Sequence, residues 1–257
     1  MNPGTRAAMF GRSFFLQALW SPAGMQNLGL LFALEPALKE IYPQEQERRR
    51  AGLRHMGYFN TNPYMSGFVL GVVARLEKSL CGCADPERAE ERLDALKKAM
   101  GAALAAVGDA AVWGALQPAC AAAAVLAATV SWLFDFKFAA LACALGYLAL
   151  FNAPTLWLRW KGLSLGYDLG ENLPAALQEW NWRRTVLRIR LAGFLCAAAA
   201  PALLLVREAG FVGWRSALAA AAFGAFFALR RAGWSSPAVY ASCVTAAFGF
   251  RGVLALL

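Results

Sequence analysis

Two neighbouring apolar stretches decide the fold: AAVWGALQPACAAAAVLAATVSWLF over residues 110–134 and FAALACALGYLALFNAPTLWL over residues 138–158. Each can cross a bilayer as a helix, because a span needs about 20 mainly apolar residues to cross a core of about 30 Å. Three further candidate spans follow, at residues 189–206, 211–229 and 237–257. The sequence therefore predicts an all-α integral membrane protein with about five spans.

The first hundred residues differ from the rest. The chain as a whole is 59% hydrophobic and 16% charged, whereas soluble proteins carry about 45–50% and about 25%, and the apolar excess lies beyond residue 100. Before residue 100, the apolar runs Asn27–Leu38 and Phe59–Leu76 are too short to cross a bilayer. Such runs are typical of re-entrant or amphipathic hairpins. We therefore expect two regions: residues 1–100, which also hold charged cytoplasmic segments, and the spanning residues 101–257.

Basic residues orient the spans. The net charge is +9, from 25 Lys+Arg and 16 Asp+Glu. Thirteen of the 25 precede the first span, and six more lie between Arg159 and Arg190, in the expected loop between the second and third spans. Cytoplasmic loops carry such an excess, so it indicates a cytoplasmic N-terminus and not a nucleic-acid-binding surface. No basic segment followed by a long apolar run opens the chain, so we expect no cleaved signal peptide.

The sequence holds no pattern of a metal site, a cofactor site or a known catalytic motif. Of the six cysteines, only Cys81 and Cys83 are close in sequence, as C-x-C without a second pair or a nearby histidine. That spacing indicates neither a zinc site nor a disulfide framework. The H-E-x-x-H, G-x-S-x-G and P-loop patterns are missing, which argues against a membrane enzyme built on those sites. We therefore expect no cofactor.

Three blocks, in order along the chain, resemble a known family. They are FFLQALWSPAGMQNLGLLFALEPALKEIYP from Phe14, RHMGYFNTNPYMSGFVLGVVARLE from Arg54 and AALAAVGDAAVWGALQP from Ala102. These blocks resemble the IID subunits of the mannose/fructose/sorbose class of sugar phosphotransferase systems, and the resemblance covers nearly the whole chain. The second block matches the most specific part of the family pattern, R-H-x-x-x-F-N-T-x-P.

The resemblance implies a function. Subunits of this family pair with a IIC subunit to form the sugar pathway across the bacterial plasma membrane, as trimers of IIC–IID pairs. Cytoplasmic IIA and IIB subunits carry the phosphoryl group, so the IID subunit is expected to be non-catalytic and its substrate a hexose-type sugar. The alternative is a non-transporting relative that serves as a regulatory or assembly partner in such a pathway.

The candidate sugar-binding residues begin with Asn60, Thr61 and Asn62, which interrupt apolar sequence. Neutral amides and hydroxyls suit a sugar because each can donate and accept hydrogen bonds. The alternative is a purely structural Asx turn before a helix. The turn role is compatible with sugar contact, so both remain open.

Three more candidates are Gln26, His55 and Asp109. Gln26 matches the family's M-Q-x-L-G. His55 is the only histidine, and we favour a structural or supporting role over phosphorylation, because the soluble subunits carry phosphate in this family. Asp109 follows Gly108 at the edge of a span, where an acidic side chain usually faces protein, water or ligand. Its alternative role is to cap the helix that carries Trp113.

The chain departs from the family pattern inside these blocks. Ser21-Pro22-Ala23-Gly24 replaces a polar N-x-E-R, and Asn62 stands where a histidine is frequent. Alanines replace two prolines and one glycine in the third block, at Ala103, Ala106 and Ala110. The small-residue segments are expected to pack on another subunit.

Overall fold

The computed structural model describes residues 1–81, 83–209, 224–225, 228–229 and 231–233. Within that part, the chain is helical with no strand, only isolated bridges. The elements in order are α1 (Pro3–Ser13), α2 (Asn27–Ile41), α3 (Glu45–Arg54), α4 (Ser66–Leu80), α5 (Pro86–Gly108), the π-helix η1 (Asp109–Leu116), α6 (Gln117–Leu133), α7 (Ala139–Leu169), the short 3-10 helix η2 (Gly170–Asn172), α8 (Leu173–Glu179) and α9 (Trp182–Ala209).

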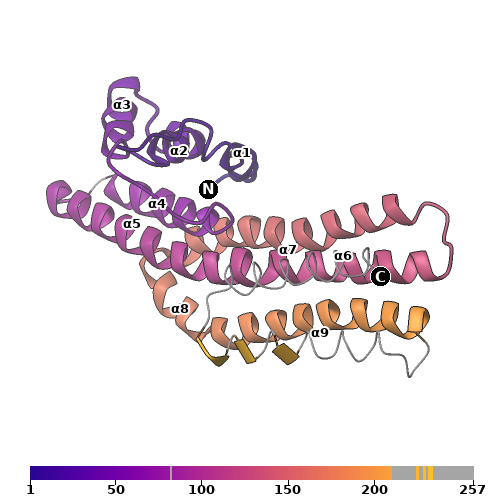
Figure 1. Cartoon of the computed structure of the whole chain (residues 1–257). Coiled ribbons are helices and arrows are strands. Elements are labelled where there is room, and N and C mark those ends of the chain that lie inside the picture. The colour runs from indigo at the N-terminus through magenta and orange to yellow at the C-terminus, as the bar shows by residue number, and fades with distance from the viewer. Residues whose placement is uncertain (82, 210–223, 226–227, 230, 234–257) are drawn as a thin grey trace.

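The helices α1 to α4 gather at one end of the molecule, and α6, α7 and α9 run side by side away from them (Figure 1). Three helical stretches are long and apolar enough to cross a membrane: Pro86–Leu133, Ala139–Glu179 and Trp182–Leu204. They confirm the all-α membrane fold and overlap the first three predicted spans, at residues 110–134, 138–158 and 189–206. The fourth and fifth, at residues 211–229 and 237–257, lie outside the described residues except for 224, 225, 228 and 229.

The spanning helices are longer than the apolar runs within them. The second span was expected to end at residue 158, but α7 continues to Leu169. The expected loop from Arg159 to Arg190 is therefore mostly helix, because a helix that leaves the bilayer can continue when one face packs on protein. The helix α5 likewise passes through residue 100 without a break and continues through η1 into α6.

Close glycine contacts join α4 to α7. Gly67 and Gly71 on α4, and Gly162 and Gly166 on α7, are each spaced by four residues. A Cβ at Gly71 would lie 2.6 Å from the backbone nitrogen of Tyr167, and one at Gly162 would lie 2.8 Å from the Phe68 ring. Small residues at this spacing let two helix backbones approach closely. The glycine faces of α4 and α7 thus pack on each other within the chain.

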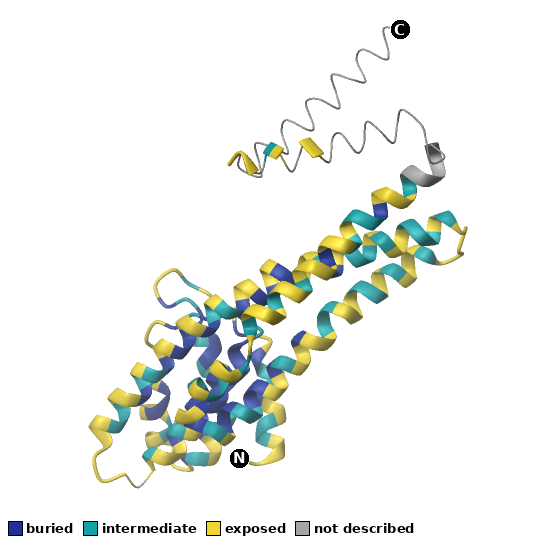
Figure 2. Cartoon of the chain, turned by 90° about the horizontal axis from the view of Figure 1, so that it is seen from below, coloured by how far each residue is buried: buried dark blue, intermediate teal, exposed yellow. Residues whose placement is uncertain are grey.

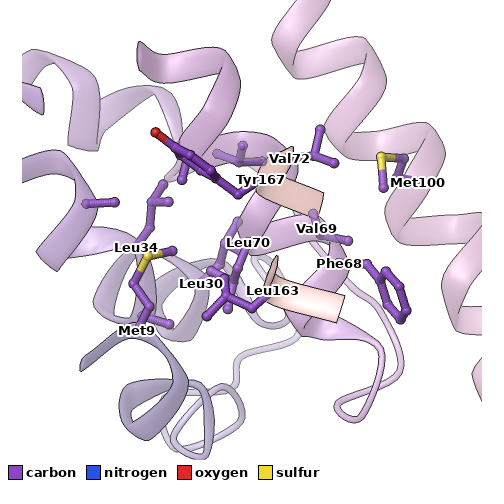
Figure 3. Close-up of a cluster of buried hydrophobic side chains, with 14 of the residues drawn as sticks. Met9, Leu30, Leu34, Phe68, Val69, Leu70, Val72, Met100, Leu163 and Tyr167 are labelled. Carbon is purple, nitrogen blue, oxygen red and sulfur yellow. The ribbon is translucent and has the colours of Figure 1, made fainter. Parts of the chain in front are cut away.

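The buried core lies where α1, α2, α4 and the last turns of α7 meet. Met9, Leu30, Leu34, Leu70 and Leu163 are among its fully or nearly fully buried side chains (Figure 3). Beyond this core, the long helices expose most of their apolar surface (Figure 2). That distribution suits a packed unit at one end and lipid- or subunit-facing helices beyond it.

Candidate functional site

The loop that holds the candidate residues lies between α3 and α4 and is fixed by Gln26. The side-chain amide of Gln26 donates to the Thr61 carbonyl at 2.9 Å and accepts from the Thr61 backbone N–H at 3.0 Å. The Gln26 backbone N–H donates to the Phe59 carbonyl at 2.8 Å. Gln26 is buried, and one amide oxygen and one amide N–H are thus bonded to the loop backbone. The structure places Gln26 behind the candidate site as its support.

Asn62 and Asp109 are brought together from different elements. The Asn62 side-chain amide donates to an Asp109 carboxylate oxygen at 2.9 Å, and its oxygen accepts from the Tyr64 backbone N–H at 3.0 Å. The second bond is the expected Asx turn. Gly108 makes the approach possible, because any Cβ there would collide with the Asn62 side chain. Asn62 therefore serves the turn and the Asp109 contact together.

Asp109 does not cap a helix, so that alternative is wrong. It lies within the unbroken helix Pro86–Leu133, with helical angles of φ −64° and ψ −41°. It begins the π-helical segment η1, and such segments are frequent at functional sites. Asp109 is exposed, and its one hydrogen bond in the described structure comes from Asn62. Its second carboxylate oxygen remains available to a ligand.

Asn60 and Thr61 precede Asn62 in the same loop and have unused polar groups. The Asn60 side chain is half-buried and forms no hydrogen bond within the described residues. It lines a pocket of about 180 Å³ together with Tyr58, Lys98 and other residues of the loop and α5. The Thr61 hydroxyl is buried and also has no partner. Because buried polar groups are normally bonded, Thr61 Oγ1 leaves hydrogen-bonding capacity unused.

An aromatic cluster flanks the Asn62–Asp109 contact. Tyr64 and Trp113 meet edge to face with their ring centroids 5.4 Å apart, and Phe151 of α7 completes the cluster 5.6 Å from Tyr64. The Trp113 ring is 41% exposed. An exposed indole next to amide and carboxylate groups combines an apolar face with hydrogen-bonding groups, as small-molecule sites commonly do.

His55 lies apart from these residues, in a buried network centred on Glu77. His55 Nε2 is 2.9 Å from Glu77 Oε1, and both side chains are fully buried. Arg54 contacts the same carboxylate at 3.1 Å with two nitrogens, and the Tyr42 hydroxyl donates to it at 2.9 Å. Within the described structure, His55 thus faces the protein interior, and its role fits support of the loop that follows it.

The network holds Glu77 charged and His55 neutral. Burial raises the pKa of Glu77, but hydrogen bonds from His55 and Arg54 outweigh burial and lower this pKa to about 2. Burial lowers the pKa of His55, against the opposing hydrogen bond to Glu77. A neutral imidazole that donates from Nε2 leaves Nδ1 without a proton, and Nδ1 is the ring atom that is buried without a partner.

Sequence reasoning missed Glu77, Tyr42 and Trp113 as neighbours of the candidate residues. Glu77 is the last residue of the second block, and its place in that block was the only sequence signal for it. Tyr42 and Trp113 gave no local signal, because their contacts join segments far apart in sequence. Among the described residues, no group of three His, Cys, Asp or Glu side chains could hold a metal ion.

Comparison with known proteins identifies the family. Residues 2–196 match the family described as the IID component of the mannose/fructose/sorbose phosphotransferase systems. The chain is 34% identical to the sorbose-specific EIID component of Klebsiella pneumoniae over 67% of this chain and 60% of that protein. It is 32% identical to the mannose-specific EIID component of Escherichia coli K12 over 63% of this chain and 54% of that protein. The chain thus aligns with little more than half the length of these relatives.

Solved structures show the same fold. A cryo-EM structure of the mannose transporter ManYZ with microcin E492 matches with a TM-score of 0.58 and 26% identity, covering 77% of this chain and 69% of that chain. Another solved membrane protein matches with a TM-score of 0.63 and 25% identity over the same shares. The resemblance found in the three sequence blocks is confirmed, and the chain belongs to the IID component family of the mannose/fructose/sorbose phosphotransferase systems.

Proposed function

We propose that this chain is the IID subunit of a sugar permease in a bacterial plasma membrane. With a IIC subunit, it forms the translocation pathway for a hexose-type sugar, in a trimer of IIC–IID pairs. The IIA and IIB subunits phosphorylate the sugar on the cytoplasmic side, and the IID chain itself performs no catalysis. The observation that carries this proposal is the Asn62–Asp109 contact, which places a carboxylate with a free oxygen at the edge of an apolar span.

The contact residues have distinct roles in this proposal. Asp109 and Asn60 offer hydrogen bonds to sugar hydroxyls, because each has unused capacity. Asn62 orients Asp109, and Thr61 Oγ1 serves as a further donor or acceptor when the loop adjusts. Gln26 and His55 do not contact the sugar. They position the loop through their buried hydrogen bonds, Gln26 with the Thr61 backbone and His55 with Glu77.

Sugar uptake with Asp109→Asn tests the proposal. Asparagine keeps an oxygen that can accept from Asn62, so the substitution removes the charge and keeps the contact. Cells that co-express the chain with its IIA, IIB and IIC subunits should lose roughly 10- to 100-fold in uptake, since a hydrogen bond to a charged group contributes about 1.5–3 kcal/mol. Asn60→Ala should also lower uptake more than assembly, by removing one hydrogen-bonding amide.

The matched control is Asp168→Asn. Asp168 is an exposed aspartate on α7, and it forms no hydrogen bond or ion pair with the described residues. Its variant should transport like the wild type. A wild-type complex that assembles but takes up no sugar would contradict transport and favour a regulatory or assembly role. Uptake unchanged in Asp109→Asn would remove Asp109 from the pathway.

A further inference from the structure

Arg159 is a buried cation without an anionic partner among the described residues. Its side chain lies in the seam between α1 and α7 and is 5% exposed. Its Nη1 donates to the Ser13 hydroxyl at 3.3 Å, and its Nε is buried without any partner. The Phe14 ring centroid lies 4.6 Å from the guanidinium carbon. A buried charge is costly unless it is paired. An anion bound next to Arg159 would therefore offset the cost of burying its guanidinium group.

Two more cations on the same stretch of α7 and α1 are also unpaired. Arg6 donates from Nη1 to the Ser164 hydroxyl at 3.3 Å, and its Nε is likewise buried without a partner. Lys161 is exposed and forms no ion pair with the described residues. By contrast, Arg12 and Arg54 both contact carboxylates. Positive charge therefore accumulates along the seam without compensation.

The position of the seam along α7 matches the headgroup layer of a bilayer. From Ala139 to Trp157, α7 rises roughly 28 Å at 1.5 Å per residue, close to the thickness of a hydrocarbon core of about 30 Å. Trp157 and Trp160 are 58% and 39% exposed at one boundary. The aromatic turn at the other boundary exposes Phe134, Phe136 and Phe138. Such aromatic residues favour the two interfaces, so Arg159 lies at headgroup depth.

We propose that the seam between α1 and α7 binds the phosphate of an anionic phospholipid headgroup. The guanidinium groups of Arg159 and Arg6 hold unused N–H donors, and guanidinium matches phosphate oxygens in charge and geometry. Lys161 adds a third positive charge. Phe14 is 51% exposed beside the seam and offers an apolar surface to the acyl chains. Three uncompensated cations select a lipid with net negative charge over a zwitterionic one.

Thermal unfolding of the purified full chain tests this site. In neutral detergent micelles, phosphatidylglycerol should raise the midpoint temperature by several degrees more than phosphatidylcholine, because a ligand bound only by the folded state stabilises it. Arg159→Gln should lose most of this difference. The matched control is Arg184→Gln, because Arg184 is an exposed arginine on α9, and its variant should keep the full difference.

Three outcomes would overturn the proposal. Equal shifts with the two lipids would show that headgroup charge is not recognised, and a full phosphatidylglycerol shift in Arg159→Gln would exclude this seam. Inorganic phosphate at the same concentration should give no shift, and an equal shift would assign the seam to a soluble anion and not to a lipid. If Arg159→Gln yields no folded protein, the double variant Arg6→Gln, Lys161→Gln replaces it, since neither of these residues is fully buried. The double variant should also lose most of the difference between the phosphatidylglycerol and phosphatidylcholine shifts, and a full difference would overturn the proposal.

Discussion

Glu77 is the centre of a buried charged network at the packed end of the molecule. Its carboxylate is fully buried and accepts hydrogen bonds from Arg54, His55 and Tyr42. The substitution Glu77→Gln removes the negative charge and leaves Arg54 close to an uncharged amide. Breaking a buried ion pair costs about 3–5 kcal/mol, so the variant should unfold at a markedly lower denaturant concentration. Chemical unfolding followed by tryptophan fluorescence measures this loss.

The same network predicts how stability depends on pH. The pKa of Glu77 falls from 4.5 to about 2 on folding, so its contribution is complete above pH 4.5 and is lost as the pH falls toward 2. The pKa of His55 is lowered from 6.5, so stability also begins to fall below pH 6.5. Glu77→Gln should remove the contribution of Glu77 to the pH dependence of stability between pH 4.5 and 2. The contributions of the other carboxylates should remain. An unchanged acid profile in this variant would contradict the assignment.

At the scale of elements, the crossing of α4 and α7 depends on glycine. A Cβ at Gly71 would collide with the Leu163 carbonyl oxygen and lie 2.6 Å from the Tyr167 nitrogen. Gly71→Ala should therefore lower the free energy of unfolding by about 1–3 kcal/mol through overpacking. Gly146→Ala on α7 is the control, since nothing lies within 4 Å of its Cβ position. Alanine there should be neutral or stabilising by up to about 1 kcal/mol, and equal losses at both positions would refute the close crossing.

The sequence predicted the positions of the first two spans but not which helices pack on one another. Continuous apolar runs set the first two spans to within a few residues at their hairpin, because Phe134–Phe138 breaks both helices. The spacing of Gly67 and Gly71 was not used to predict packing, and that spacing alone could not have named α7 as the partner of α4. Gly108-Asp109 looked like a helix start, because both residues are common at helix ends. The tertiary contact with Asn62 explains why they lie inside a continuous helix.

At the scale of the whole molecule, the fold places the charged segments together. Arg92 of α5 contacts Glu171 of η2, so the start of the first long helix and the connection between α7 and α9 lie at the same end. From the positive-inside rule, we expect that end to be cytoplasmic. In a chain without its six natural cysteines, a cysteine at position 172 should not react with a membrane-impermeant reagent in intact cells. A cysteine at position 136 in the hairpin should react, and the reverse labelling would invert the topology.

The long helix through Asp109 has a mechanical consequence. It runs from Pro86 to Leu133 without a loop, and Asn62 holds it near its midpoint through Asp109. The part of this helix beyond Asp109, up to Leu133, is roughly 36 Å long at 1.5 Å per residue. If this part tilted by about 10° at Asp109, its end would move sideways by roughly 6 Å on that rise. A ligand that changed the Asn62–Asp109 hydrogen bond and tilted the helix in this way would displace the Leu133 end of the helix, at the opposite face of the membrane.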